Sequence, residues 1–261
     1  LMKNADLALY RAKELGRNNY QFCTPEMTSK AQEKMSRQNA VIHAFAKNEF
    51  LLHYQPKLDL ISQRISGVEA LLRWSNKTFN NITTKEIIYL AEETGLILPL
   101  NDWVLKTACE QMKIWHAAGY PLTLSVNLSA RQFKQANFAE NLIKILKKIN
   151  FPAEFLELEI TENLIMQDPE YILHVLHMLK DKQIRIAIDN FGTGYSSLNY
   201  LQRFSIDKIK IDKSFIQRIN LDPANASIIT AIIAMANKLE IKTIAEGVET
   251  REQYEFLLRE K

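Results

Sequence analysis

Six short apolar runs in this chain each lead into a polar residue that can bind a metal ion or carry a proton. Those polar residues are Glu69, Asn127, Glu159, Asp189, Lys210 with the neighbouring Asp212, and Glu246. Strands that are apolar on both faces belong to parallel sheets covered by helices. In a closed α/β barrel, the carboxyl ends of the strands converge at one mouth, where chemistry takes place. The pattern therefore predicts an α/β barrel whose mouth holds a metal site suited to a phosphate ester.

Composition narrows the functional class. A length of 261 residues suits one α/β barrel of about 250 residues. The net charge of +3 is too small to favour a nucleic-acid polymer as partner. Cys23 and Cys109 form no CxxC motif and are predicted to be free thiols, which favours a cytoplasmic location. Residue 1 is leucine, so we expect a piece of a longer chain, whose other segments are free to include a membrane anchor.

Hydrophobic periodicity predicts alternating strands and helices from about residue 41 onward. Strands are expected near residues 50, 66, 122, 155, 184, 206 and 242. Helical patterns cover residues 84–94, 101–118, 130–149, 169–182, 194–203, 225–239 and 252–261. The short segment 56–64 favours an antiparallel turn between the first two strands, and the remaining order favours parallel βα units. Seven strands leave an eight-stranded barrel one short.

A series of motifs then resembles one family in its order along the chain. Glu69-Ala70-Leu71 with Arg73 is similar to the signature of EAL-domain cyclic-di-GMP phosphodiesterases. The segments that match other family motifs are YQP at 54–56, AEETGLI at 91–97, SVNLS at 125–129, LEITE at 158–162, DNFGTGYSSL at 189–198, KIKID at 208–212 and AEGVET at 245–250. The resemblance spans residues 41–261. It implies a TIM-like (β/α)8 barrel with an antiparallel first or second strand, here without the eighth strand.

The resemblance also implies roles for single residues. It implies hydrolysis of cyclic di-GMP to linear 5'-pGpG with two Mg²⁺ or Mn²⁺ ions, since hard divalent cations prefer oxygen ligands. Lys210, Glu246 and Glu69 would be catalytic, with Lys210 near the attacking water. The implied metal ligands are Glu69, Asn127, Glu159, Asp189, Asn190 and Glu246. The implied substrate-binding residues are Gln55, Leu71, Arg73 and Asp212.

A glycine-containing loop follows Asp189. Gly192 and Gly194 flank Thr193 in a chain that has only seven glycines. One interpretation is a turn that needs positive φ. The family resemblance implies a mobile loop that shapes the metal site, is anchored by Glu162 and couples the site to a dimer interface. Both interpretations can hold, because a hinge can also be a turn.

The sequence departs from the family at two places. Where the family has two adjacent aspartates, this chain has Asp189 followed by Asn190, which brings no negative charge to a second metal ion. The chain also stops at Lys261, before the eighth strand that family members carry. We therefore expect a weakened second metal site, and a cut chain or a strand supplied by a neighbouring molecule.

The first 40 residues resemble something else. Residues 1–16 have a helical apolar pattern, and the segment from Ala5 to Tyr20 is similar to the last helix of a GGDEF (diguanylate cyclase) domain without its signature. The expected organisation is a GGDEF remnant at 1–25, a linker helix at 26–40 and an EAL domain at 41–261. The resemblance implies a homodimer, with upstream GGDEF and sensory domains in the full-length chain.

Three functions stay open at this point. The first is the phosphodiesterase, which the retained Glu69, Asn127, Glu159 and Lys210 favour. The second is a receptor that binds cyclic di-GMP without cutting it, which Asn190 and the missing strand keep open. The third, from the fold alone, is a metal-dependent lyase or isomerase with Lys210 as base.

Overall fold

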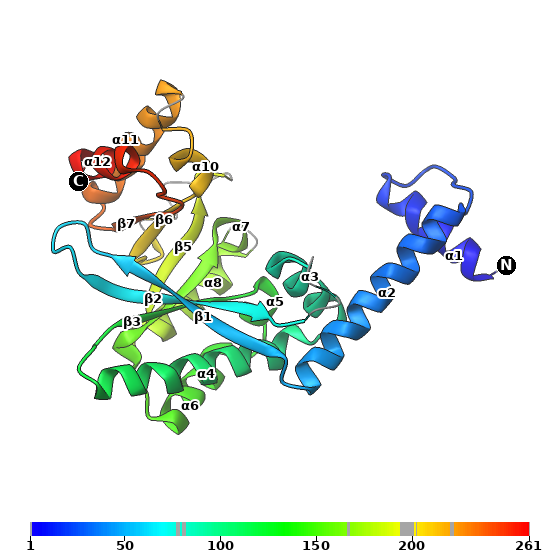
Figure 1. Ribbon diagram of the computed structural model, residues 1–261, viewed down its shortest axis with the longest axis horizontal. Helices are drawn as coiled ribbons and strands as arrows, with labels where there is room; N and C mark the ends of the chain where they lie inside the picture. The colour runs from blue at the N-terminus through cyan, green and yellow to red at the C-terminus, as the bar shows by residue number, and fades with distance from the viewer. Residues whose placement is uncertain are drawn as a thin grey trace. The chain divides into compact units, whose positions relative to one another are not determined.

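The structure of the protein is a computed structural model (Figure 1). It describes residues 2–76, 79, 82–165, 168–193, 201, 203–219 and 222–260. The strands are β1 (Phe50–Leu58), β2 (Ile65–Trp74), β3 (Thr123–Asn127), β4 (Leu156–Thr161), β5 (Arg185–Phe191), β6 (Lys208–Ile211) and β7 (Lys242–Ala245). The helices are α1 (Met2–Glu14), α2 (Pro25–Ala46), α3 (Thr84–Thr94), α4 (Ile97–Ala117), α5 (Ala130–Phe133), α6 (Phe138–Ile149), α7 (Glu162–Ile165), α8 (Pro169–Lys180), α10 (Lys213–Ile216), α11 (Pro223–Lys238) and α12 (Arg251–Glu260).

Among the described residues, seven strands form one sheet in the order β1-β2-β3-β4-β5-β6-β7. Each strand from β2 to β7 pairs in parallel with the next. β1 and β2 are joined by a six-residue turn, too short for the crossover that parallel neighbours need, so this pair is antiparallel. The turn is closed by a hydrogen bond from the Asp59 N–H to the Arg64 carbonyl at 2.9 Å. The predicted α/β fold with an antiparallel first strand is confirmed.

Local sequence signals explain where the helices begin and end. The Thr24 and Thr83 hydroxyls cap α2 and α3 by accepting backbone N–H groups of the first helical turn. Gly95 closes α3 in the left-handed conformation, with φ of 79°. Asp222 caps α11, and a proline occupies the first position of that helix.

The chain divides into two compact units. The first comprises Leu1–Leu51 and Leu72–Leu100, and in it α2 packs against α3. Val41 and Ala44 are buried in this unit, and the Lys34 ammonium pairs with Glu93 at 2.7 Å.

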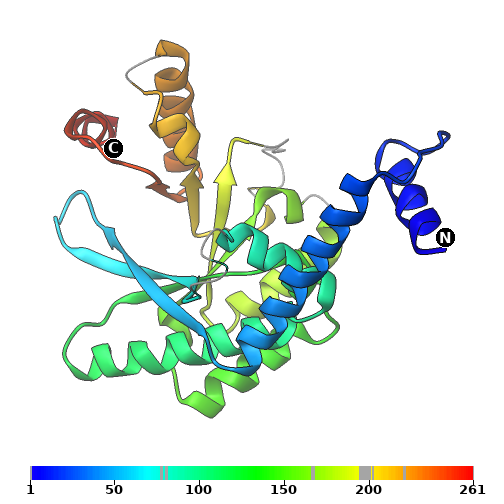
Figure 2. The ribbon, with the colours of Figure 1, turned by 45° about the vertical axis from the view of Figure 1, so that its right-hand side comes forward.

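The second unit, Leu52–Leu71 with Asn101–Lys261, holds β3 to β7 and most of β1 and β2 (Figures 1 and 2). Its central strands are buried on both faces: Leu124, Leu158 and Ile186 are each fully buried. α8 contacts β5, and α11 contacts β7, so helices cover the outer surface of the strands.

Gly67 marks a close approach of β2 to β3. A Cβ built at this position would lie 2.7 Å from the Thr123 carbonyl oxygen, closer than real Cβ atoms come. The two strands are paired here, with Gly67 opposite Thr123. Glycine at position 67 therefore allows the backbones of β2 and β3 to pack closely at Thr123. Glu69 follows two residues later on β2.

The predicted elements agree with the structure with a few differences. The pattern at 130–149 is two helices, α5 and α6, because Asn137 between them adopts φ of 63°. The pattern at 101–118 belongs to a helix that already begins at Ile97, and the predicted segment 194–203 lies largely outside the described residues. The helix expected at 1–16 is α1, and the linker helix expected at 26–40 is part of the longer α2. In the described part of the chain, no helix combines the length and apolarity that a membrane crossing requires.

Candidate active site

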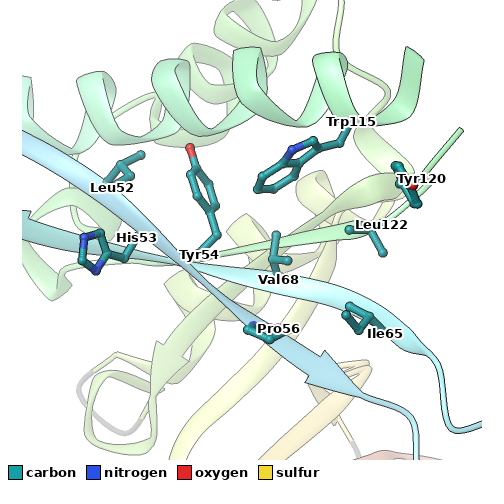
Figure 3. Close-up of a pocket in the computed structure, with 9 residues that line it drawn as sticks. All are labelled: Leu52, His53, Tyr54, Pro56, Ile65, Val68, Trp115, Tyr120 and Leu122. Carbon is teal, nitrogen blue, oxygen red and sulfur yellow. The ribbon is translucent and has the colours of Figure 1, made fainter. Parts of the chain in front are cut away.

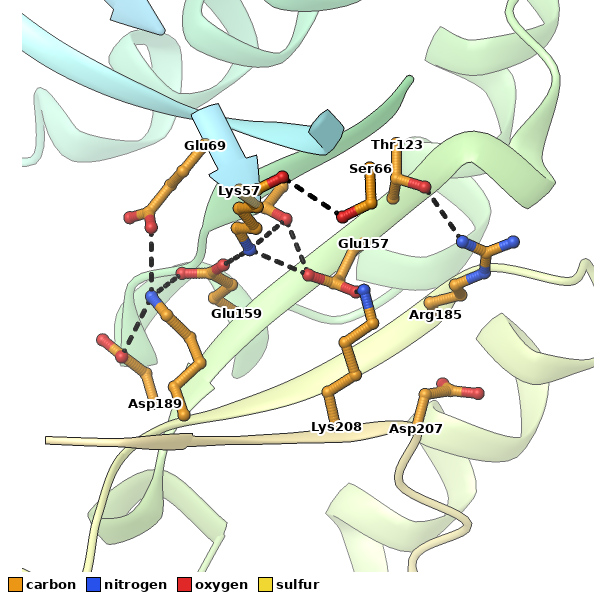
Figure 4. A network of polar contacts seen from close by, with 12 residues as sticks. Lys57, Ser66, Glu69, Thr123, Glu157, Glu159, Arg185, Asp189, Asp207 and Lys208 are labelled. Carbon is orange, nitrogen blue, oxygen red and sulfur yellow. Dashed lines mark hydrogen bonds and ion pairs between the residues drawn. The ribbon is translucent and has the colours of Figure 1, made fainter. Parts of the chain in front are cut away.

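The ammonium group of Lys210 lies among the four carboxylates of Glu69, Glu159, Asp189 and Glu246. Figure 4 labels the first three of these carboxylates. The distances from Nζ are 3.1 Å to Glu69, 3.1 Å to Asp189 and 2.7 Å to Glu246, and Nζ also pairs with Glu159. The Lys210 side chain is only 2% exposed. The structure therefore brings together five of the residues that the sequence predicts at the mouth of the barrel.

The parallel strands explain this convergence. Glu69 lies on β2, Glu159 on β4 and Asp189 on β5, and Asn127 is the last residue of β3, directly opposite Glu159. The Asn127 side-chain amide donates to Glu69 at 2.8 Å, which ties β3 to β2 at the site. Glu246 follows the last residue of β7. Carboxyl ends of neighbouring parallel strands lie at one edge of a sheet, so residues far apart in the sequence meet there.

Electrostatics keep Lys210 charged in this arrangement. Burial alone would lower the pKa of the Lys210 ammonium, but the surrounding carboxylates, Glu159 first, outweigh burial and raise that pKa. Burial and the neighbouring Glu159 raise the pKa of the Glu69 carboxyl, against the opposing effect of Lys210. Lys210 is therefore a hydrogen-bond donor in this state and has no lone pair with which to accept a proton.

The donor set fits a hard divalent cation. Glu69, Asn127, Glu159 and Asp189 bring carboxylate and amide oxygens to one place, the ligand type that Mg²⁺ and Mn²⁺ prefer. The buried Asp189 Oδ1 lies 3.1 Å from the Lys210 ammonium and has no other hydrogen-bond partner among the described residues, so it keeps a lone pair to offer a metal ion. The described residues hold no group of three or more His, Cys, Asp or Glu side chains already arranged as a metal centre. Instead, the carboxylate oxygens of Glu69 and Asp189 are directed at the Lys210 ammonium, which lies 3.1 Å from each of them.

A second polar layer, here called the lower layer because it lies further from the carboxyl ends of the strands, occupies the same face of the sheet. Figure 4 labels its Lys57, Glu157 and Lys208. Its members, two residues before Asn127, Glu159 and Lys210 on their strands, are Ser125, Glu157 and Lys208, together with Lys57 from β1. Glu157 is fully buried and pairs with Lys57 at 3.0 Å and with Lys208 at 2.5 Å. Burial would raise the pKa of Glu157, but Lys57 and then Lys208 outweigh burial and lower it to about 2.

The apolar strand pattern did not predict this layer. Glu157 lies inside the run 155–158 that leads into Glu159, so that run is not uniformly apolar. A signal was available, because side chains two residues apart in a strand point to the same face. Glu157 with Glu159, and Lys208 with Lys210, are such pairs, so a charge facing the barrel interior below the mouth could have been predicted.

The loop after Asp189 has the predicted geometry at its beginning. Gly192 adopts φ of 92°, and its N–H donates to the buried Glu162 carboxylate at 3.1 Å, as expected for an anchor. Asn190 adopts φ of 54°, and its side-chain amide donates to Asp189 at 2.9 Å. Gly194 lies outside the described residues.

The predicted substrate-binding residues are more scattered. Gln55 is exposed on β1, two residues before Lys57 and therefore on the strand face that carries the polar layers. Leu71 is half-buried on β2. Asp212 accepts the Ser214 N–H at 2.8 Å and caps α10 rather than joining the carboxylate cluster. Arg73 belongs to the first unit, where it donates to the Leu72 carbonyl at 2.8 Å.

The opposite face of β1 lines an open, largely apolar groove of about 660 Å³ (Figure 3). Tyr54 and Pro56 of β1 and Val68 of β2 form one side, and Trp115 of α4 forms the other. The rings of Tyr54 and Trp115 meet edge to face, with centroids 4.9 Å apart. The groove lacks the carboxylates of the interior face, so it is a separate feature from the Lys210 cluster.

A family model described as "EAL domain" matches residues 38–260. The chain belongs to the EAL domain family. MucR of Pseudomonas aeruginosa, described as a bifunctional diguanylate cyclase/cyclic di-GMP phosphodiesterase, is 42% identical over 260 residues, covering 99% of this chain and 38% of MucR. The cyclic di-GMP phosphodiesterase NbdA of the same organism is 39% identical over 258 residues, covering 98% of this chain and 33% of NbdA. The chain thus spans less than two fifths of the length of either relative.

A solved structure described as PaMucR phosphodiesterase in a c-di-GMP complex matches the EAL domain with a TM-score of 0.81 and 40% sequence identity. The match covers 85% of this chain and 92% of that one. EAL phosphodiesterases generally depend on divalent metal ions. The predicted family and its TIM-like α/β fold are therefore confirmed.

Proposed function

We propose that this EAL domain hydrolyses one phosphodiester bond of cyclic di-GMP to give linear 5'-pGpG. One observation carries the proposal: Glu69, Glu159, Asp189 and Glu246 converge on a buried lysine at the carboxyl ends of parallel strands. Relatives that this chain matches over nearly its whole length are described as cyclic di-GMP phosphodiesterases. The carboxylate cluster gives this chain the oxygen ligands that such a reaction requires.

Two Mg²⁺ or Mn²⁺ ions are the proposed cofactor. Glu69, Asn127, Glu159 and Asp189 would hold the first ion, and Asp189, Asn190 and Glu246 the second. When bound, such ions activate water and stabilise charge on the phosphoryl oxygens. Asn190 contributes no charge, so the second site binds more weakly than a site with two aspartates.

The protein's own groups would do the rest. The Lys210 ammonium donates hydrogen bonds, and as a cation close to four carboxylates it can orient the attacking water or stabilise negative charge on phosphate oxygen. Gln55 and Leu71 would contact the dinucleotide, and Arg73 would bind a phosphate bidentately. Glu162 would hold the loop through Gly192 and so keep Asp189 and Asn190 in place.

A receptor function is the second candidate, and the Asn190 amide favours it. This side chain points its donor at Asp189, which leaves the second ion with a neutral ligand. Incubation of the protein with cyclic di-GMP and Mn²⁺, followed by chromatography of the products, separates the two functions. Linear pGpG supports the phosphodiesterase. Bound but unchanged cyclic di-GMP supports the receptor, and absence of binding overturns both.

Other features of the full-length protein stay predictions of the family resemblance. They are homodimerisation, a GGDEF domain and sensory domains upstream, and a cytoplasmic location. Size measurement in solution with and without cyclic di-GMP tests the dimer directly.

A further inference from the structure

The Lys57 ammonium uses all of its hydrogen-bonding capacity inside the sheet. A lysine has three N–H donors. Those of Lys57 go to Ser125 Oγ at 2.6 Å, to Glu157 Oε1 at 3.0 Å and to Glu159 Oε1 at 2.6 Å. Three acceptors from two strands therefore fix the position of this ammonium, which comes from a third strand, β1.

Lys57 is the described residue through which the lower polar layer contacts Glu159. Oε1 of Glu159 accepts from Lys57, and Oε2 pairs with Lys210. The Glu159 side chain is fully buried, so its carboxylate is not in contact with bulk water. Its orientation is thus set by two lysines that reach it from β1 and β6.

Ser125 and Glu157 in turn fix Lys57. The Ser125 hydroxyl accepts from Lys57 and donates to Glu157 Oε1 at 2.7 Å, which closes a ring of three hydrogen bonds. Lys208 neutralises the other side of Glu157 and, among the described residues, forms no hydrogen bond or ion pair with Glu159. Lys57 and Lys208 therefore both pair with the Glu157 carboxylate, but only Lys57 of the two also donates a hydrogen bond to Glu159.

We propose that Lys57 is a positioning residue for metal binding: it holds Glu159 Oε1, so that Oε2 is presented toward Glu69, Asn127 and Asp189. This inference rests on the proposed function, in which Glu159 is a metal ligand. Groups that hydrogen-bond to a metal ligand from outside typically change metal affinity or activity by about 10- to 100-fold when they are removed.

Charge alone predicts the opposite effect. A cation near a divalent ion repels it, so loss of the Lys57 charge would strengthen metal binding if Lys57 had no positioning role. Loss of positioning weakens metal binding. The sign of the change in affinity therefore separates the two explanations.

The experiment compares wild type with Lys57→Met and with its matched control Lys208→Met. Mn²⁺ binding is measured by calorimetry without substrate, and melting temperature is measured in chelator. Both variants are expected to melt at a lower temperature, because Glu157 loses one of its two lysines. Lys57→Met is expected to raise the Kd for Mn²⁺ about 10-fold or more. Lys208→Met is expected to leave that Kd within about twofold of wild type, or to lower it by the charge effect.

A folded Lys57→Met protein that binds Mn²⁺ as tightly as wild type, or more tightly, overturns the inference. So does an equal weakening in both variants, which would show a general structural effect. Wild type that binds no Mn²⁺ overturns it as well. If Lys57→Met does not fold, Ser125→Ala replaces it, since this change removes no charge and loosens Lys57. A several-fold weaker Mn²⁺ affinity then supports the inference, and an unchanged affinity overturns it.

Product analysis on the same wild-type preparation keeps the two proposals apart. If wild type binds Mn²⁺ but forms no pGpG, the hydrolytic function fails while the Lys57 comparison still gives its answer. If pGpG forms but Lys57→Met keeps its Mn²⁺ affinity, only the role of Lys57 fails.

Discussion

The two faces of β1 differ in the chemistry that they bury. On the outer face, Tyr54 and Pro56 line an apolar groove with Trp115. On the inner face, Lys57 contributes an ammonium that is bonded by one hydroxyl and two carboxylates. Alternation of side chains along a strand allows both in consecutive residues. The inner face carries charged side chains that contact the proposed metal site, so substitutions on it should affect activity and metal binding. The outer face contributes apolar packing, so substitutions on it should affect stability alone.

The largest effect is expected at Glu159 on the inner face. Glu159→Gln removes the carboxylate that Lys57 and Lys210 share and that the proposed first metal site needs. Several kcal/mol of transition-state stabilisation correspond to a loss of cyclic di-GMP hydrolysis of about 1000-fold. Initial rates of pGpG formation at saturating Mn²⁺ measure this. A Glu159→Gln rate within tenfold of the wild-type rate would show that the Glu159 carboxylate is not needed for hydrolysis.

Glu157 tests the stability of the inner face. Glu157→Gln leaves Lys57 and Lys208 without their shared carboxylate in a place where neither is well exposed. Breaking a buried ion pair costs about 3–5 kcal/mol, and the partial exposure of the lysines reduces this to about 2–3 kcal/mol. Urea denaturation in chelator measures the free energy of unfolding. An unchanged midpoint would show that the lysines find other partners.

Trp115 gives the matching test on the outer face. Trp115→Ala removes the ring that meets Tyr54 edge to face. The side chain is half-buried, so the expected loss is about 1–2 kcal/mol of unfolding free energy, below the cost of truncating a core tryptophan. The Mn²⁺ concentration for half-maximal hydrolysis should stay that of wild type. A shift in this concentration would mean that a change in the groove alters metal binding on the inner face of the sheet.

The smallest effect is expected at Asn190. Asn190→Asp replaces the amide that donates to Asp189 by a second carboxylate, and aspartate tolerates the left-handed backbone at this position. Ligand charge strengthens binding of divalent ions, so the half-saturating Mn²⁺ concentration should fall a few-fold. Superimposable Mn²⁺ titrations of the two proteins would show that Asn190 does not limit the second site.

The sequence was informative where the motif and the strand pattern coincide. Glu69, Asn127, Glu159, Asp189, Lys210 and Glu246 were predicted to meet, and the structure places them together. Parallel pairing makes this possible, because a residue at the carboxyl end of one strand has a fixed neighbour on the next. The bounds of α3 were likewise predicted, as its caps are local signals.

The lower layer was not predicted because its partners are distant in the chain. Lys57 is 100 residues from Glu157, and nothing next to either residue marks the other. The break between α5 and α6 was missed for a different reason. Asparagine tolerates the left-handed region, so Asn137 at the N-cap of α6 separates that helix from α5 without the glycine or proline that usually marks such a break.

Gly67 has a consequence for how this domain can vary. Gly67 lies two residues before Glu69, on the strand face that carries the polar layers. Its missing side chain lets β2 approach the backbone of β3 at Thr123. Even alanine there would force apart the pair of strands that set the height of Glu69 relative to Asn127. Tolerance to substitution should therefore be low at position 67, and a saturation library screened for folded, active protein should recover glycine at this codon.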